Sequence, residues 1–433
     1  MKKHLALCLL ACAALSAQQT PAPTELAASP YFIKNTWIIG GAGNWDYLTV
    51  DPQASRLFIA HGPVVQVVDT DTGTLAGQVT GFSSAHSIAL DDTGEFGYIS
   101  DGPAGQVKVF DRRSFAVVAS IPTGPNPRAL VLEPQSRLLF AICASPLAVT
   151  PPQPSASQAK SSPGATTRSS QQNSNPQPVP NLEIKTSITV IDVQTRQPLG
   201  EILMPGNLGF AQSDGNGQVF ILIVNRNQVA RLDAQAIASL LHRRSDAAAP
   251  TQPNPSQPSP AIETAPPIVL DWSHESRPAQ SSENSLRFFA LGPDCLEARS
   301  LAVDGKHLRL FAACNNMKMT VLNGGTGEVV ASLPIGPGVE AIGYDPGRGL
   351  IYTANGGANG SLTIIHQDVT DTYAEIQNLP TRQRARTLAV NQDTGQVYLV
   401  TDLLGVNVAQ PGGIGTLKTA SVNGSFQVLV IGN

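Results

Sequence analysis

The sequence predicts an all-β fold, a seven-bladed β-propeller with four-stranded antiparallel blades. The prediction rests on a repeated motif, its period, and strand-like segments at both chain ends. A motif of alternating apolar residues that closes on Asp, Glu or Asn occurs seven times, ending at Asp51, Asp91, Glu133, Asp214, Asp304, Asp345 and Asn391. The successive intervals are 40, 42, 81, 90, 41 and 46 residues. Each long interval holds one low-complexity insert, so all reduce to the blade length of about 40–45 residues.

The first repeat places all four strands of a blade. We expect strand A at Tyr47–Val50, strand B at Arg56–Ala60, strand C at Val64–Val68 and strand D at Thr74–Val79. Asp, Pro and Gly separate these β-branched runs, because they supply side-chain bonds, a fixed φ and a positive φ to tight turns. Similar segments occur at Gly105–Ile121, Ser187–Ile202, Met317–Leu333 and Ser361–Leu379.

The seventh repeat is completed by both ends of the chain. Its strands A and B end near Asp402, and Gly424–Ile431 is predicted to form strand C. The unassigned segment Tyr31–Ile39 then supplies strand D. This closure removes the open sheet edge that would otherwise template aggregation. The predicted propeller therefore spans residues 31–433.

Two inserts interrupt the propeller. The first, about 145–182, lies between strands B and C of blade three, and the second, about 236–284, between strands C and D of blade four. Both are rich in Pro, Ser, Gln, Asn and Ala, a composition that predicts disordered loops. The second contains a candidate helix at Ala236–Arg243 and an apolar piece at Ile268–Trp272.

The N-terminus predicts export. Residues 1–17 combine a basic start with a short apolar run that ends in small residues, as in a secretory signal peptide, and residues 18–30 form a linker. The run is too short to span a bilayer. An alternative interpretation makes Cys12 the lipidated first residue of a lipoprotein. Either way, we expect a periplasmic, secreted or cell-surface protein.

Charge narrows the choice of partner. The formal net charge is −4 with a pI near 6.0, and removal of Lys2 and Lys3 with the signal would make it −6. This balance provides no global attraction to nucleic acid or an anionic membrane.

The candidate site is one mouth of the central channel. Strands A and B are antiparallel, so the starts of the A strands and the ends of the B strands meet at the same face. The starts contribute Trp45, Asp46, His86, Arg128, Arg299, Glu340, Arg384 and Arg386, and the ends contribute His61, Asp101, Asn225, Asn315, Asn355 and Asp402. From these we select Trp45, Asp46, His61, His86, Arg128, Glu340 and Arg386 as candidate ligand-binding residues.

Two interpretations of these residues stay open. The arginines suit a carboxylate, phosphate or sugar-acid ligand. Alternatively, they pair with the nearby carboxylates and only complete the rim of the channel. A metal site at His61 and His86 is disfavoured because no His pair has helical ligand spacing, so we assign no metal and no cofactor.

Cysteines predict one disulfide. Cys295 precedes strand A of blade five and Cys314 follows its strand B, so the antiparallel arrangement brings them side by side. Cys143 lies at the same strand-B position two blades away, and we expect it to stay free and buried.

Several segments resemble the YVTN-type bacterial β-propeller repeat family. These are Trp45–Pro52, Arg56–Gly62, Ile351–Gly356 and Arg384–Val390, and the resemblance extends from about Trp37 to Asp402 outside the inserts. It implies an exported seven-bladed propeller that acts as a binding or scaffold protein. Our leading interpretation is that it engages a protein, peptide or envelope polymer through the mouth of the channel.

The alternative function is enzymatic. The chain lacks a nucleophile elbow, a zincin helix, a P-loop and a dinucleotide fingerprint, which lowers the expectation of catalysis. Related propellers with lactonase or hydrolase activity nevertheless place Arg, Glu and His around this channel. A small anionic substrate would then meet Glu340 or His86 as general base, with Arg128 or Arg386 stabilising the developing negative charge.

Overall fold

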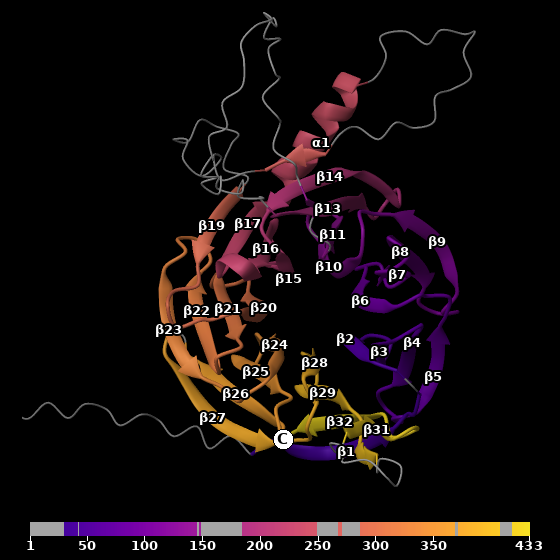
Figure 1. The fold of residues 1–433 in the computed structure, drawn as a ribbon, viewed down its shortest axis with the longest axis vertical. Coiled ribbons are helices and arrows are strands. Elements are labelled where there is room, and N and C mark those ends of the chain that lie inside the picture. Colours follow the sequence, from indigo (N-terminus) through magenta and orange to yellow (C-terminus); the bar gives the residue numbers. More distant parts are fainter. Residues whose placement is uncertain are drawn as a thin grey trace, which may run out of the picture.

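Seven antiparallel sheets surround a central channel in the computed structural model (Figure 1). The structure describes residues 30–41, 43–144, 147–148, 184–248, 267–270, 286–368, 371–407 and 418–433. The predicted signal peptide, residue 12 and most of both inserts lie outside these ranges. Within the residues that the structure describes, no helix has the length and apolar character needed to cross a bilayer.

Each blade runs outward from strand A at the channel to strand D at the rim. Blade one is β2 (Trp45–Asp51), β3 (Arg56–His61), β4 (Val64–Asp69) and β5 (Leu75–Val79). Blade two is β6 (Ala85–Leu90), β7 (Phe96–Asp101), β8 (Gln106–Asp111) and β9 (Val117–Pro122). Blade three is β10 (Pro127–Glu133), β11 (Leu138–Cys143), β13 (Ile184–Asp192) and β14 (Gln197–Pro205). Blade four is β15 (Leu208–Ser213), β16 (Gln218–Ile223), β17 (Gln228–Asp233) and β19 (Leu286–Ala290).

The remaining three blades repeat this order. Blade five is β20 (Ala298–Asp304), β21 (Arg309–Cys314), β22 (Lys318–Asn323) and β23 (Val329–Pro334). Blade six is β24 (Val339–Asp345), β25 (Leu350–Asn355), β26 (Ser361–Gln367) and β27 (Tyr373–Pro380). Blade seven is β28 (Thr387–Asn391), β29 (Gln396–Thr401), β32 (Gln427–Gly432) and β1 (Phe32–Ile38). The predicted fold class is therefore confirmed.

The two chain ends close the ring as expected. β1 pairs with β32 in antiparallel register, from Phe32 opposite Gly432 to Ile38 opposite Gln427. Beside it, the hydroxyl of Tyr31 lies 2.9 Å from that of Tyr352 in blade six. The side-chain amide of Gln377 accepts a hydrogen bond from the N–H of Tyr31 and donates one to its carbonyl, both at 2.8 Å. The N-terminal segment thus joins blade seven to blade six.

One buried aromatic residue anchors each blade. The third residue of every B strand is Phe or Tyr, and none of the seven rings is exposed to solvent. The set is Phe58, Tyr98, Phe140, Phe220, Phe311, Tyr352 and Tyr398. Large aromatic rings bury more apolar surface than other side chains, so this position supplies much of the contact between blades.

The blade-four insert contributes structure to blade three. Helix α1 (Ala234–Ala248) places Ile237 and Leu241 in the same apolar cluster as β14, and strand β18 (Ile268–Val269) pairs with β14 in parallel. From the first insert, β12 (Leu147–Ala148) pairs with the start of β13. Together they extend the blade-three sheet to six strands, beyond the four that the repeat predicts.

Candidate functional site

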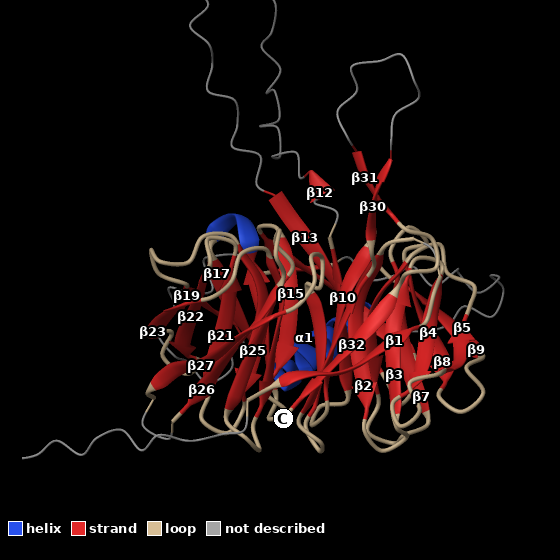
Figure 2. Cartoon of the chain, turned by 90° about the horizontal axis from the view of Figure 1, so that it is seen from below, coloured by secondary structure: helices blue, strands red, loops and turns tan. Residues whose placement is uncertain are grey.

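The two faces of the propeller differ in what they present. We call the face with the starts of the A strands the mouth face, and the face with the A–B turns the turn face. Hairpin β30 (Leu404–Asn407) and β31 (Lys418–Ser421), the start of β13 and the short helix η1 (Val224–Arg226) all lie on the mouth face (Figure 2). Helix α1 starts where β17 ends, on the turn-face side.

Repeated carboxylates on the turn face are structural. Glu133 accepts hydrogen bonds from the backbone N–H of Ser136 at 2.6 Å and, from blade four, of Gly217 at 3.0 Å. Asp345 accepts one from the backbone N–H of Gly347 at 3.0 Å and pairs with Arg348 at 2.9 Å. The predicted role of these residues in turns is confirmed, which leaves the mouth face as the candidate site.

A β-bulge presents one residue of each A strand to the mouth. In blades one to six the pairing of strand A with strand B shifts register around the second residue of the strand. A bulged residue leaves the ladder, so its side chain is aimed away from the regular pleat. The residues at this position, with the one preceding β28, are Asp46, His86, Arg128, Gly209, Arg299, Glu340 and Arg386. We call them the mouth ring.

Ion pairs join members of the mouth ring. Asp46 Oδ2 lies 2.7 Å from His86 Nδ1 and 3.4 Å from a guanidinium nitrogen of Arg128, two blades away. Glu340 Oε2 lies 2.9 Å from Arg386 Nε, although the alignment is not that of a hydrogen bond. The third arginine of the ring, Arg299, lies 3.2 Å from the carboxylate of Glu297, which precedes strand β20. Each arginine of the ring therefore has a carboxylate beside it.

An aromatic pair forms the floor of the mouth. Tyr47 of blade one and Phe210 of blade four face each other across the channel with ring centroids 5.3 Å apart. The same strand position in the other blades holds a small residue: Ser87, Ala129, Ser300, Ala341 or Thr387. Burial raises the pKa of Tyr47, Asp46 and Glu340 add to the rise, and Arg128 opposes it. The hydroxyl is thus a neutral hydrogen-bonding group at the base of a charged ring.

Trp45 and His61 are not part of the exposed mouth. Trp45 is buried between blades one and seven, where its ring packs 5.2 Å from Phe426. Arg384, which is held by Asp402 at 2.9 Å, covers Trp45 with its guanidinium 4.7 Å from the ring. His61 is also buried, with its Nδ1 2.7 Å from Gln66 and its ring 4.1 Å from Phe426. Both residues consolidate the contact between blades.

Residues at the ends of the B strands also have structural partners. Asp101 is buried, accepts hydrogen bonds from the N–H groups of Ser83 and Ser84 at 3.0 Å, and lies 3.3 Å from Lys108. Asn355 is buried and donates to Thr363 at 2.9 Å.

The two amides that stay exposed make similar short-range bonds. Asn225 accepts from the N–H of Asn207 at 2.7 Å, and Asn315 donates to Glu297 at 3.1 Å. Residues at the B-strand ends therefore pair with neighbours and complete the rim of the channel. The accessible charge lies instead at the starts of the A strands.

His86 is held with its second nitrogen against the backbone. A Cβ atom placed on Gly102 would lie 2.8 Å from His86 Nε2, so a larger residue at this position would displace the imidazole. Among the described residues, no three His, Cys, Asp or Glu side chains gather closely enough to hold a metal ion.

The predicted disulfide is present. Cys295 and Cys314 are bonded with Cα atoms 5.4 Å apart, and they join the start of strand A to the end of strand B in blade five. Cys143 is a buried free thiol, and burial raises its pKa to about 11.

Comparison with known proteins identifies the fold. No protein-family model matches the chain, and no curated protein matches its sequence. A chain of the mitotic checkpoint complex superposes with a TM-score of 0.55 at 13% identity, covering 90% of this chain and 96% of that one. U3-55K superposes with a TM-score of 0.57 at 8% identity, over 90% of this chain and 97% of that one. The WD40 repeats of RRP9 give 0.57 at 8% identity, over 91% and 96%. The chain thus has a WD40-like seven-bladed propeller fold.

Proposed function

We propose that the protein is an exported binding or scaffold propeller that engages a protein, peptide or envelope polymer through its mouth face. The observation that carries this proposal is the mouth ring. Four of its side chains stay accessible: Arg128, Arg299, Arg386 and Glu340 keep 36–52% of their side-chain surface exposed. Charged groups at this exposure select and orient a partner more than they stabilise the fold.

Apolar residues accompany these charges on the same face. Leu296 and Met317 in blade five are 56% and 51% exposed, and Leu403 and Val422 beside hairpin β30–β31 are 42% and 44% exposed. Arginine and methionine are enriched at protein interfaces. Exposed apolar groups around an arginine-bearing mouth therefore favour a protein or peptide partner over nucleic acid. One structural neighbour is a chain of the mitotic checkpoint complex, so a propeller of this fold occurs as a component of a protein complex.

Export is supported by the disulfide between Cys295 and Cys314, because such bonds persist in oxidising compartments. It is also what the YVTN-type resemblance and the basic, then apolar, N-terminus imply. N-terminal sequencing of the protein from its native cell tests this. A mature chain that starts at residue 18 supports a soluble exported protein, and a start at Cys12 supports the lipid anchor. An intact Met1 in the mature protein would refute export.

One observation supports an enzymatic alternative, a lactonase or hydrolase that acts on a small anionic substrate. The pair of Asp46 with His86, next to Arg128, has the composition of a base with a neighbouring anion-binding group. However, the close approach of Gly102 leaves little room for a substrate at His86 Nε2. We therefore rank catalysis second.

A thermal-shift screen of residues 18–433 separates these functions. The panel holds cell-wall fragments, acidic peptides, sugar acids, lactones and short DNA, with lactone hydrolysis followed in parallel. A ligand at about 100 times its Kd should stabilise the protein by about 2.7 kcal/mol. The Arg128→Ala/Arg299→Ala variant should lose this shift.

The matched control, Arg113→Ala/Lys306→Ala, removes the same charge from exposed positions of the turn face. This variant should keep the thermal shift that the ligand produces. Equal shifts in the two variants would refute the mouth as the binding surface. Lactone turnover that depends on His86 would favour the enzyme.

A further inference from the structure

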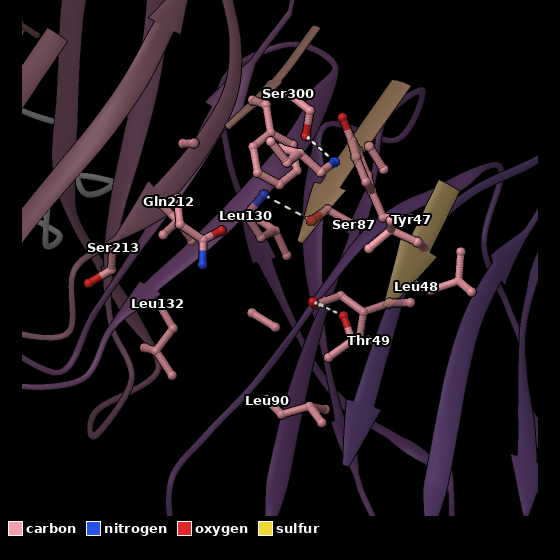
Figure 3. Close-up of a pocket in the computed structure, with 18 of the residues that line it drawn as sticks. Tyr47, Leu48, Thr49, Ser87, Leu90, Leu130, Leu132, Gln212, Ser213 and Ser300 are labelled. Carbon is pink, nitrogen blue, oxygen red and sulfur yellow. Dashed lines mark hydrogen bonds between the residues drawn. The ribbon is translucent and has the colours of Figure 1, made fainter. Parts of the chain in front are cut away.

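A chamber lies behind the mouth, below the pair Tyr47 and Phe210. It has a volume of about 420 Å³ and is lined by the A strands of all seven blades (Figure 3). It extends along the channel to Pro134 and Gly215 at the turn face. This volume lies within the range of about 300–1,000 Å³ that is typical of small-molecule sites.

The wall of the chamber carries no charged side chain. Most of the lining residues are aliphatic, such as Leu90, Leu132 and Ile342, although polar atoms make up almost half of the exposed wall. An ion moved there from water would lose its hydration without a compensating partner. The chamber therefore favours a neutral ligand over the anionic ligands that suit the mouth ring.

Hydroxyl groups in the wall are already used between blades. Thr49 donates to the carbonyl of Ile88 at 2.8 Å, and Ser87 accepts from the N–H of Leu130 at 3.1 Å. Ser300 likewise accepts from the N–H of Ile342 at 3.4 Å. Figure 3 shows these bonds along the strands. These bonds hold neighbouring blades together and engage three of the five hydroxyl groups in the wall; a fourth, Ser213, accepts from the N–H of Gly215 at 2.9 Å.

Gln212 differs from the rest of the wall. The same strand position in the other six blades holds a smaller residue: Thr49, Ala89, Val131, Ala302, Gly343 or Ala389. The Gln212 amide is exposed to the channel, points into the chamber in Figure 3, and has no hydrogen-bond partner among the described side chains and backbone. A primary amide offers two donors and an acceptor at one point of an apolar surface.

We propose that this chamber binds a small, neutral, mostly apolar molecule whose single amide-like group pairs with Gln212. Because Tyr47 and Phe210 narrow the channel on the mouth side, the molecule reaches the chamber from the turn face. The proposal concerns a second site, and it does not depend on a partner at the mouth ring.

The probe is 4-iodobenzamide, which combines an aromatic ring, a neutral amide and an iodine atom that anomalous diffraction can locate. Calorimetry should give saturable binding of one molecule per chain, and crystals soaked with the probe should show iodine between the A strands. Gln212→Leu should raise the Kd of the probe roughly 3- to 10-fold, because one or two hydrogen bonds are lost. The same variant should bind iodobenzene, which has no amide, at least as well as the parent does.

Two further variants make the result decisive. Gln212→Trp fills the chamber and should abolish binding of both probes, while Arg386→Gln alters the mouth ring and should leave both unchanged. The absence of saturable binding, iodine located outside the channel, or full binding in a folded Gln212→Trp variant would each overturn the proposal. If Gln212→Trp does not fold, the iodine position in the parent protein decides alone.

Discussion

The contact between blades one and two depends on Arg112, and its removal should destabilise the whole ring. The guanidinium pairs with Asp51 of blade one, donates to the backbone carbonyl of Asp91 in blade two at 2.9 Å, and lies 3.6 Å from the Asp91 carboxylate. All three side chains are at most 8% exposed. Removing one partner of a buried pair leaves an uncompensated charge and costs about 3–5 kcal/mol.

The expected shift in melting temperature follows from the size of the ordered chain. With about 320 described residues and an unfolding entropy of about 2.1 cal/mol/K per residue, this cost lowers Tm by roughly 4–8 °C. Calorimetry on Arg112→Ala measures it. The double variant Asp51→Asn/Arg112→Met removes both charges, and its Tm should fall by less than that of the single variant. A single variant that melts within 1 °C of the parent would refute this assignment.

Three other predictions concern the core and the cysteines. Replacing both Cys295 and Cys314 by alanine should lower the free energy of unfolding by about 3 kcal/mol, because the bond closes a loop of about 20 residues; a denaturant titration that finds no loss would contradict this. Phe140→Ala should cost about 3–5 kcal/mol, since the ring is fully buried, and a midpoint equal to that of the parent would show that it does not anchor its blade. Cys143 should react with a thiol reagent at pH 8 only after unfolding, because burial raises its pKa to about 11. Rapid labelling of the native protein would disprove this.

Much of the fold could be predicted from the sequence because blades repeat. The period, the turn residues and the strand-like ends at Tyr31–Ile39 and Gly424–Ile431 were sufficient to predict seven blades and their closure. The same repeat contains a signal that we did not use: an aromatic residue at the third position of every B strand, for example Phe58 and Tyr98. Aligning the repeats on that residue would have located the core.

The site could be predicted only in part. Antiparallel geometry correctly placed Cys295 next to Cys314, because neighbouring strand ends must meet. It gave no means to separate Trp45, which is buried, from Asp46, which the bulge turns toward the mouth and which is partly exposed. Aligning the repeats would have separated them, because six of the seven repeats carry a charged or titratable residue at the position of Asp46.

Contacts across the channel were also beyond sequence reasoning. The pairing of Tyr47 with Phe210 joins blades one and four, and the position of α1 against blade three joins an insert to a sheet from another repeat. Neither contact follows the repeat, so periodicity contains no information about them. Phe210 and Gln212 were visible as departures from the small residues at the equivalent positions, which is the signal that could have indicated the chamber.

The central claim is that the mouth face binds the partner, and site-specific photo-crosslinking in the native cell tests it most directly. A photoreactive residue replaces Met317, which is exposed at the mouth, or Lys306, which is exposed on the turn face. The account predicts an adduct of defined mass from position 317 and none from position 306. In the Arg128→Ala/Arg299→Ala variant, the adduct from position 317 should disappear. Adducts from position 306 alone, or from position 317 regardless of the two arginines, would contradict it.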